Sequence, residues 1–423
     1  MSNLEPVHDP IQRNVRTWKQ GLLTWLRGPK SLSHLVVVST MFVLAVVVAG
    51  DIWTVERRLS EGAIEKSIEA PFYEVPDPLP IGSPGLLFRS EQLLSAPDGA
   101  LEWRILYHST DVQGQDILVS GVVVSPDKTA PANGRTIISW GHPTTGAARR
   151  CAPSLGIDPF DTIEGLRQLL DAGYVVVATD YSGMGAVGPD SYLIGVTEGN
   201  NVLDAARAAR QIPQTESSNR LVLWGHSQGG QAVLFAGQSA SAYAPELDLR
   251  GVAVAAPATD LGELLKSDIA DVSGVTIGSY AFASYNAVYA GTPGTNLDTI
   301  LTPQGVASTP RMAALCLIGQ NAEIHKIATP LVGDYLIDDP AIKEPWATLL
   351  EANTPGSVRL TVPLFVAQGD ADKLVHPDIT KQFVQHERDI GTEVTFITIP
   401  DTSHGLIAIF ALPKLLYWLA HLP

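Results

Sequence analysis

The feature that most constrains this sequence is a serine between two glycines, placed between a strand pattern and a helix pattern. The apolar run 221–224 is typical of a buried strand, and the Ala-rich stretch 231–240 is typical of a helix. Between them lies the pentapeptide GHSQG, with Ser227 flanked by Gly225 and Gly229. Glycines let strand and helix approach closely, and the sharp turn lifts the serine hydroxyl clear of the sheet. Free N–H groups at the helix start stabilise a developing negative charge there, so the pattern predicts a nucleophilic serine.

The composition is that of a folded protein. The chain has 423 residues, of which 45% are hydrophobic and 17% charged, enough for one large α/β domain with an insertion or for two domains. The formal net charge is −16, and the acidic residues are spread along the chain. This argues against a nucleic-acid partner, because phosphate binding needs a basic face.

The N-terminal part has a different character. Residues 1–34 carry five basic and two acidic residues, a net charge of +3, so residues 35–423 carry −16 − 3 = −19. An uncharged apolar run follows at 35–50, just short of the ~20 residues that span a bilayer and long for a signal-peptide core. We favour an uncleaved signal anchor over 35–54 rather than a cleaved signal sequence. Segment 1–34 is then cytoplasmic, the protein contacts the membrane, and the catalytic body lies outside it. Residues 55–84, rich in charge and proline, are expected to form a tether.

The chain from residue 85 to 258 changes from a hairpin pattern to alternating strands and helices. Two antiparallel strands followed by a βαβ series indicate an α/β fold with a mostly parallel central sheet and helices on both faces. The expected hairpin strands are 102–108 and 117–124; the later strands are 136–140, 174–179, 221–224 and 251–256, and the helices before the serine are 162–172 and 201–211.

The alternation stops over residues 259–359. This stretch has helical patterns at 261–269, 280–289 and 312–318 but no clear strand, and strands resume at 362–368 and 393–399. We expect a mainly helical lid inserted into a core made of 85–258 and 360–423. The alternative is an extra domain remote from the serine.

A serine hydroxyl is a poor nucleophile, so it needs a base and a carboxylate that orients the base. After such an elbow the acid precedes the histidine in the chain. Asp370 and Asp372 follow the strand 362–368, at the edge where ligands bind in open α/β sheets. We favour Asp372, because the turn after Gly369 aims the later residue back toward the sheet, whereas Asp370 caps the turn.

The base expected from this pattern is His404, on the loop between the last strand and an apolar helix. Its loop lies at the same sheet edge as the serine. His376 is too near Asp372 in sequence to be its partner, and His386 lies in a charged, solvated helical stretch.

A nucleophilic serine of this type also needs two N–H donors for the oxyanion that forms when it attacks a carbonyl. One is the N–H of Gln228, the residue after the serine. The other is expected on the loop 141–146 after an earlier strand. Pro143 has no N–H, so the donor belongs to a neighbouring residue.

Several stretches together resemble the secretory lipase family of α/β-hydrolases, the group of yeast lipase A and many exported actinobacterial lipases. The resemblance implies the α/β-hydrolase fold, ester hydrolysis and a mostly helical lid. The expected triad mechanism needs no metal or organic cofactor. It is carried by SWGHPTTG at 139–146, CAPS at 151–154, DYSGMG at 180–185, YLIG at 192–195, GHSQGG at 225–230, and the regions of Asp372 and His404.

The resemblance also bears on three residues outside the triad. By themselves, Cys151 and Cys316 can form a disulfide in an exported chain or remain as buried free thiols. The resemblance implies that they are bridged. It also places the second oxyanion donor on the Thr144–Thr145 turn, at Thr145 when counted back from Cys151. The chain departs from similar bacterial sequences at Pro143, where they usually carry glycine.

The sequence therefore predicts a serine hydrolase that cleaves carboxylic esters of apolar acyl character through an acyl-enzyme. Acyl transfer to an alcohol uses the same residues and is the main alternative. A non-catalytic binding module is disfavoured because the triad is complete, and no feature supports peptidase activity.

Overall fold

The computed structural model describes residues 40, 54–67, 70–160 and 162–423. The chain separates into two compact units, 1–57 and 58–423, and the account below concerns the second. The predicted cytoplasmic segment 1–34 and, apart from residues 40 and 54, the predicted membrane segment 35–54 lie outside the described residues. Among the residues that are described, none of the helices has the length and apolar character needed to cross a membrane.

The described residues form a nine-stranded sheet in the order β1-β2-β3-β5-β4-β6-β7-β8-β9. Strands β1, β2 and β3 pair antiparallel, β3 pairs antiparallel with β5, and β4 to β9 are parallel to one another. The predicted mixed, mostly parallel sheet is therefore confirmed. The strands are β1 (Leu87–Gln92), β2 (Ala100–Thr110), β3 (Asp116–Pro126), β4 (Arg135–Gly141), β5 (Val175–Thr179), β6 (Ser217–His226), β7 (Asp248–Ala255), β8 (Leu364–Gly369) and β9 (Val394–Ile399).

Helices cover both faces of the sheet, as expected for buried parallel strands. Successive strand residues point to opposite faces: Ile137 packs in the core beneath α4, α5 and α11, and Ile138 in the core beneath α3 and α12. The bounds are α3 (Leu166–Asp171), α4 (Gly195–Ala209), α5 (Gln228–Tyr243), α11 (Pro377–Asp389) and α12 (Ile407–Leu419). Short 3-10 turns are η1 (Ala70–Tyr73), η2 (Arg149–Cys151), η3 (Pro153–Leu155), η4 (Pro213–Thr215), η5 (Leu297–Thr299), η6 (Thr329–Leu331) and η7 (His404–Leu406).

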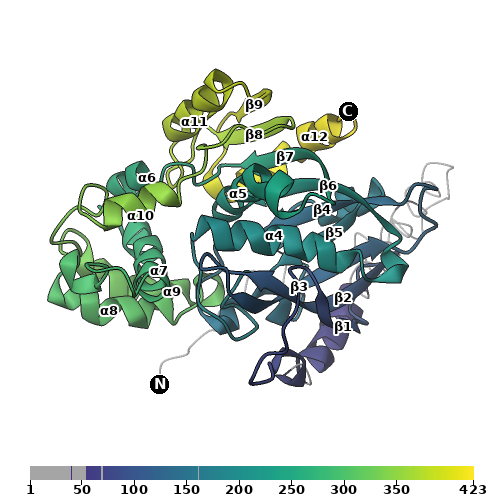
Figure 1. The fold of residues 1–423 in the computed structure, drawn as a ribbon, viewed down its shortest axis with the longest axis horizontal. Coiled ribbons are helices and arrows are strands. Elements are labelled where there is room, and N and C mark those ends of the chain that lie inside the picture. The colour runs from purple at the N-terminus through teal and green to yellow at the C-terminus, as the bar shows by residue number, and fades with distance from the viewer. Residues whose placement is uncertain (1–39, 41–53, 68–69, 161) are drawn as a thin grey trace, which may run out of the picture. The chain divides into compact units, whose positions relative to one another are not determined.

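A helical insertion, residues 259–359, lies in the chain between β7 and β8. Figure 1 shows its helices gathered to one side of the sheet, and they pack around an apolar cluster that includes Tyr280 and Trp346 and that Tyr192 and Leu193 join from outside the insertion. The helices are α6 (Leu261–Asp268), α7 (Val272–Val288), α8 (Pro303–Ala313), α9 (Leu317–Ala328) and α10 (Trp346–Ala352).

The expected helix at 312–318 is wrong, because these residues span the break between α8 and α9. Cys316 has extended backbone (φ −87°, ψ 133°) where it is bridged to Cys151, so the chain cannot continue as a helix through it.

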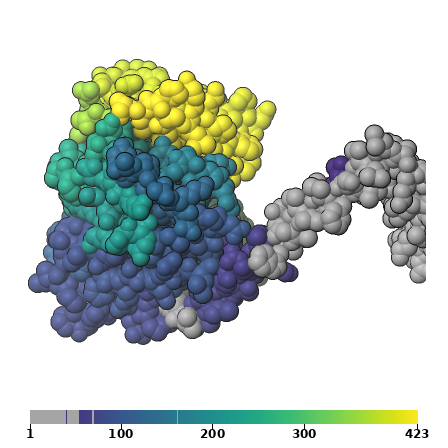
Figure 2. Space-filling view, turned by 90° about the vertical axis from the view of Figure 1, so that its right-hand side faces the viewer, coloured from purple at the N-terminus to yellow at the C-terminus, as the bar shows by residue number. Residues whose placement is uncertain are grey.

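Two N-terminal segments also differ from the sequence prediction. Residues 58–67, expected within a tether, are helical. Glu65 lies on this helix, and its Oε2 accepts a 2.6 Å hydrogen bond from Ser95 Oγ. Strand β1 was not expected; it is a half-exposed edge strand paired with β2 alone, and its polar sequence LFRSEQ carries no clear alternation. Figure 2 shows these N-terminal parts of the body at the opposite end from the C-terminal region around α12.

Candidate active site

The turn between β6 and α5 holds Ser227 in a backbone conformation that few L-residues adopt, with φ 58° and ψ −118°. Such strain costs on the order of 1–3 kcal/mol and persists only where the surroundings impose it. Here the surroundings are tightly packed backbone: a Cβ added at Gly229 would collide with the Gly141 carbonyl, and one at Gly225 with the carbonyl of Gly229. The two flanking glycines thus allow the turn that presents the hydroxyl.

Three side chains predicted from separate loops meet at the carboxyl edge of the sheet. His404 Nε2 lies 2.9 Å from Ser227 Oγ, although 177 positions separate the two residues. His404 Nδ1 lies 2.8 Å from Asp372 Oδ2. Asp372 follows β8 and His404 begins the short turn after β9, so neighbouring parallel strands deliver the acid and the base to one place.

Both oxygens of the Asp372 carboxylate accept hydrogen bonds. Its Oδ1 accepts the N–H groups of Leu374 and Val375, both at 2.9 Å, and its Oδ2 accepts Gln368 Nε2 at 3.2 Å besides His404. Burial raises the pKa of Asp372, but the hydrogen bonds, above all that from His404, outweigh it and leave the pKa below its usual value. The lowered pKa keeps this group an anion in hydrogen-bond contact with the His404 imidazole.

Asp370, the alternative acid, joins two loops instead. Its Oδ1 accepts the Asp401 N–H at 2.7 Å, which fastens the loop after β8 to the loop that carries the histidine. The other histidines considered lie elsewhere: His376 Nε2 is 3.4 Å from Asp268 Oδ1, and His386 is exposed, with Nε2 2.9 Å from the Gly356 carbonyl.

A second histidine–carboxylate pair packs against the His404 ring and was not anticipated from the sequence. The His226 ring centroid lies 4.9 Å from that of His404, and His226 Nδ1 lies 3.0 Å from Glu164 Oε2. Burial lowers the pKa of His404, the bond with Asp372 opposes this, His226 lowers it further and Glu164 raises it. The net pKa lies below the usual histidine value, so the imidazole is neutral and free to accept a proton at neutral pH.

The loop after β4 lies across from the serine. Pro143 and Thr144 border the cavity described below, whereas Thr145 is buried and donates its hydroxyl to the Cys151 carbonyl at 2.9 Å. The N–H groups of Thr144, Thr145 and Gln228 donate no hydrogen bond to another described residue. Each is therefore available to an oxyanion, and the cavity position favours Thr144 over the predicted Thr145.

A disulfide joins this loop to the helical insertion. Cys151 and Cys316 are bridged with a Cα–Cα distance of 5.2 Å, and the Ile318 N–H lies 3.4 Å from the Thr145 carbonyl oxygen. The loop opposite the serine is thus tied covalently to the start of α9.

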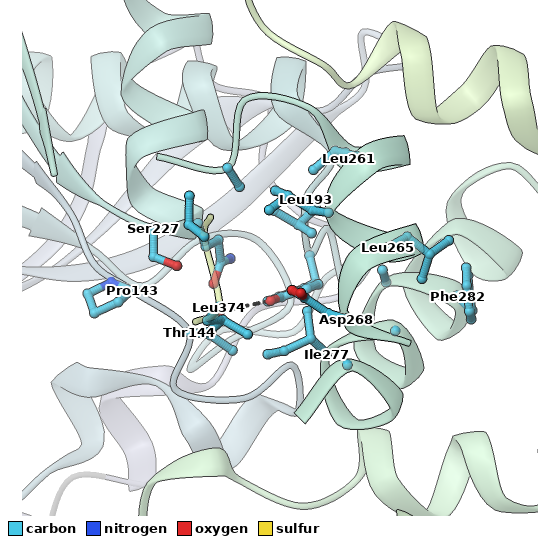
Figure 3. Close-up of a pocket in the computed structure, with 18 of the residues that line it drawn as sticks. Pro143, Thr144, Leu193, Ser227, Leu261, Leu265, Asp268, Ile277, Phe282 and Leu374 are labelled. Carbon is cyan, nitrogen blue, oxygen red and sulfur yellow. Dashed lines mark hydrogen bonds between the residues drawn. The ribbon is translucent and has the colours of Figure 1, made fainter. Parts of the chain in front are cut away.

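The serine opens into a cavity of about 150 Å³ between the core and the helical insertion. Figure 3 shows Pro143 and Ser227 on one side of it and residues of α6 and α7 on the other. Its walls are mainly apolar; they include Leu193, Leu261, Leu265, Ile277, Phe282 and Leu374, with Asp268 as an acidic exception.

The model of one protein family, described as "Secretory lipase", matches residues 161–421 of the chain. The chain belongs to the secretory lipase family. The predicted resemblance is thereby confirmed over more than half of the sequence.

Relatives of this secretory lipase cover between about half and nearly all of its length. Lipase A of Moesziomyces aphidis is 25% identical in an alignment of 419 positions that covers 92% of this chain and 86% of the relative. A "probable inactive lipase" of Mycobacterium tuberculosis is 27% identical over 212 residues, covering 46% of this chain and 47% of its own. Neither the family match nor these identities assign a role to an individual residue.

Solved structures share the fold of this secretory lipase. Candida antarctica lipase A in its closed state superimposes with a TM-score of 0.68 at 20% identity, covering 83% of this chain and 85% of its own. The rice cell wall degrading esterase LipA of Xanthomonas oryzae reaches a TM-score of 0.69 at 20% identity, covering 80% of this chain and 100% of its own. The α/β-hydrolase fold is confirmed, and family membership makes the protein a carboxylic ester hydrolase. Membership of a secretory family also supports export.

Proposed function

We propose that this protein hydrolyses apolar acyl esters through a Ser227–His404–Asp372 triad and an acyl-enzyme. The observation that carries the proposal is the pair of hydrogen-bonding distances that link the three side chains, 2.9 Å and 2.8 Å. The lowered pKa of His404 supports the role of general base, because a neutral imidazole is the form that accepts a proton.

In the proposed acylation step, His404 Nε2 takes the proton of Ser227 as Oγ attacks the ester carbonyl carbon. The N–H of Gln228 and a donor on the Thr144–Thr145 turn hold the oxyanion. For the second donor, the resemblance indicates Thr145, and Thr144 is the one that borders the cavity. The imidazolium then protonates the leaving alcohol, and water repeats the sequence on the acyl-enzyme.

The substrate is proposed to be a lipid ester. The cavity walls are mainly apolar, so an alkyl chain gains roughly 0.8 kcal/mol for each CH₂ that it buries there. The lipases among the relatives support the same substrate class. The helical insertion supplies much of the cavity wall, and we propose that it is the lid of the active site. Membrane attachment through residues 35–54 stays a prediction.

The test is hydrolysis of 4-nitrophenyl esters from acetate to palmitate by the full chain and by Ser227→Ala. We expect the variant to lose about 10³-fold or more in kcat while keeping the wild-type melting temperature. Asp372→Asn, compared with Asp370→Asn as the matched control, separates the two neighbouring acids: we expect a loss of about 10²–10⁴-fold in kcat for the first and less than about threefold for the second.

Full activity of Ser227→Ala would exclude the proposed nucleophile. If no ester is hydrolysed but a fluorophosphonate still labels Ser227, the assignment as a hydrolase of simple esters fails, and acyl transfer becomes the better explanation.

A further inference from the structure

One carboxylate lies in the otherwise apolar wall of the cavity. Asp268 is the last residue of α6, only 8% of its surface is exposed, and it borders the same cavity as Ser227. In Figure 3 it lies beside Ile277, on the side of the cavity formed by the helical insertion. The cavity residues just before it on α6, Leu264 and Leu265, are apolar.

The two oxygens of this carboxylate have different surroundings. Ser267 Oγ donates to Oδ1 at 2.8 Å, and His376 Nε2 lies 3.4 Å from the same oxygen. Oδ2 accepts no hydrogen bond from any described residue. Burial raises the pKa of Asp268 to about 6, partly opposed by Ser267 and His376, while the charge of Asp271 raises it further. At neutral pH the group is still mainly ionised.

Oδ2 is not fully enclosed: it keeps accessible surface while no described residue donates to it, so a ligand in the cavity can reach it. Other polar side chains of the cavity have protein partners: the Tyr192 hydroxyl lies 2.8 Å from Thr144 Oγ1, and the Tyr285 hydroxyl donates to the Leu193 carbonyl at 3.2 Å. On the side formed by the helical insertion, Oδ2 of Asp268 is an acceptor that no described residue occupies; on the side of the serine, Gln228 Oε1 also has no partner.

We infer that Asp268 accepts a hydrogen bond from a hydroxyl group on the acyl chain of the substrate, so that the protein prefers hydroxyacyl esters. The inference rests on the proposed function. The acyl chain is the relevant part, because it stays bound to Ser227 after the alcohol has left, and the cavity begins at that serine.

A hydroxyl fits the site better than an ammonium group. The apolar walls make an ammonium expensive to desolvate, and the His376 imidazole already lies against one oxygen of the carboxylate. A hydroxyl loses less hydration and needs only one acceptor. A site built to hydrogen-bond a substrate hydroxyl also discriminates against the analogue that lacks it.

The test compares 4-nitrophenyl esters of ω-hydroxyalkanoic acids, from six to twelve carbons, with plain alkanoates of equal heavy-atom number. For the wild-type full chain we expect kcat/KM to favour the hydroxylated ester at least about tenfold at one or more chain lengths. Asp268→Leu is expected to remove this preference, and Asp268→Asn, which keeps an acceptor, to retain part of it. Leu265→Val changes the shape of the same wall without its polarity and is expected to keep the ratio.

Equal rates for both ester series at every length in the wild type would overturn the inference, as would an unchanged ratio in Asp268→Leu or a stronger preference for ω-ammonium esters. Fluorophosphonate labelling of Ser227 and the melting temperature show whether each variant is folded, and Asp268→Asn carries the test if Asp268→Leu is not. Failure of the proposed function is distinguishable, because it removes Ser227-dependent hydrolysis of plain esters, whereas failure of this inference leaves that hydrolysis intact.

Discussion

Removal of the disulfide between Cys151 and Cys316 is expected to cost much of the protein's stability. The bridge closes a loop across a sequence separation of 165 residues. In the chain-entropy relation, ΔS ≈ −2.1 − 1.5R ln n, a loop of this length gives roughly −17 cal/mol/K, or about 5 kcal/mol at 25 °C. Measured effects usually fall below this limit, so we expect a loss of about 2–5 kcal/mol in the free energy of unfolding.

The expected catalytic effect follows from where the bridge lies. It joins the loop that carries Thr144 and Thr145 to the start of α9, so its loss frees one side of the proposed oxyanion site from the insertion. We expect a lower kcat with a smaller change in KM, because the oxyanion forms only along the reaction path.

The assay is urea unfolding of the oxidised wild type and of Cys151→Ser, Cys316→Ser and the double variant, followed by tryptophan fluorescence. Each single variant already lacks the bridge, so all three are expected to agree within about 0.5 kcal/mol. A loss below about 1 kcal/mol in the double variant, or wild-type stability in either single variant, would refute the reasoning.

Two further predictions concern the site. The acid limb of kcat/KM against pH is expected below the usual histidine pKa of about 6.5, because His404 must be neutral to act and its pKa is lowered. Glu164→Gln removes a negative charge that raises the pKa of His404, so it is expected to move the limb to still lower pH. A limb above pH 6.5 in the wild type would contradict this. Gly229→Ala places a methyl group against the Gly141 carbonyl and is expected to lower the free energy of unfolding by about 3 kcal/mol or more. The control is Gly291→Ala, where a Cβ meets nothing within 4 Å; it is expected to change the free energy of unfolding by less than about 1 kcal/mol. Equal melting temperatures for the two variants would count against the packing argument.

The buried strands were the most predictable part of the fold. The run expected at 174–179 is β5 (Val175–Thr179), because a strand covered on both faces is apolar and β-branched at nearly every position. Helix α4 was expected from 201 but begins at Gly195. Its first turns contain glycine, threonine and asparagine, which are poor helix formers, and their burial against the rest of the core overrides this preference.

The candidate site was predictable only where local pattern and strand order carry the information. Ser227 has a motif, and Asp372 and His404 follow strands that had to end at the same edge. Glu164 has no such signal, because its partner His226 lies 62 positions away. Asp268 ends an amphipathic helix and follows a lysine and a serine, a pattern typical of a solvent-exposed helix face. That its carboxylate borders the cavity becomes visible only in the tertiary structure.

The position of the helical insertion between two adjacent strands has a consequence for how this enzyme can diversify. β7 and β8 are hydrogen-bonded neighbours, with Val252 opposite Leu364, although the whole insertion separates them in the chain. Because the two strands are parallel, the insertion leaves the sheet at the carboxyl end of β7 and returns to the amino end of β8, at the opposite edge. It adds no strand between them, so its length and sequence can change without interrupting the β7–β8 pairing. If the insertion is the proposed lid, exchanging residues 259–359 for those of a relative, with Cys316 retained for its bridge to Cys151, is expected to change the acyl preference while Ser227-dependent hydrolysis continues.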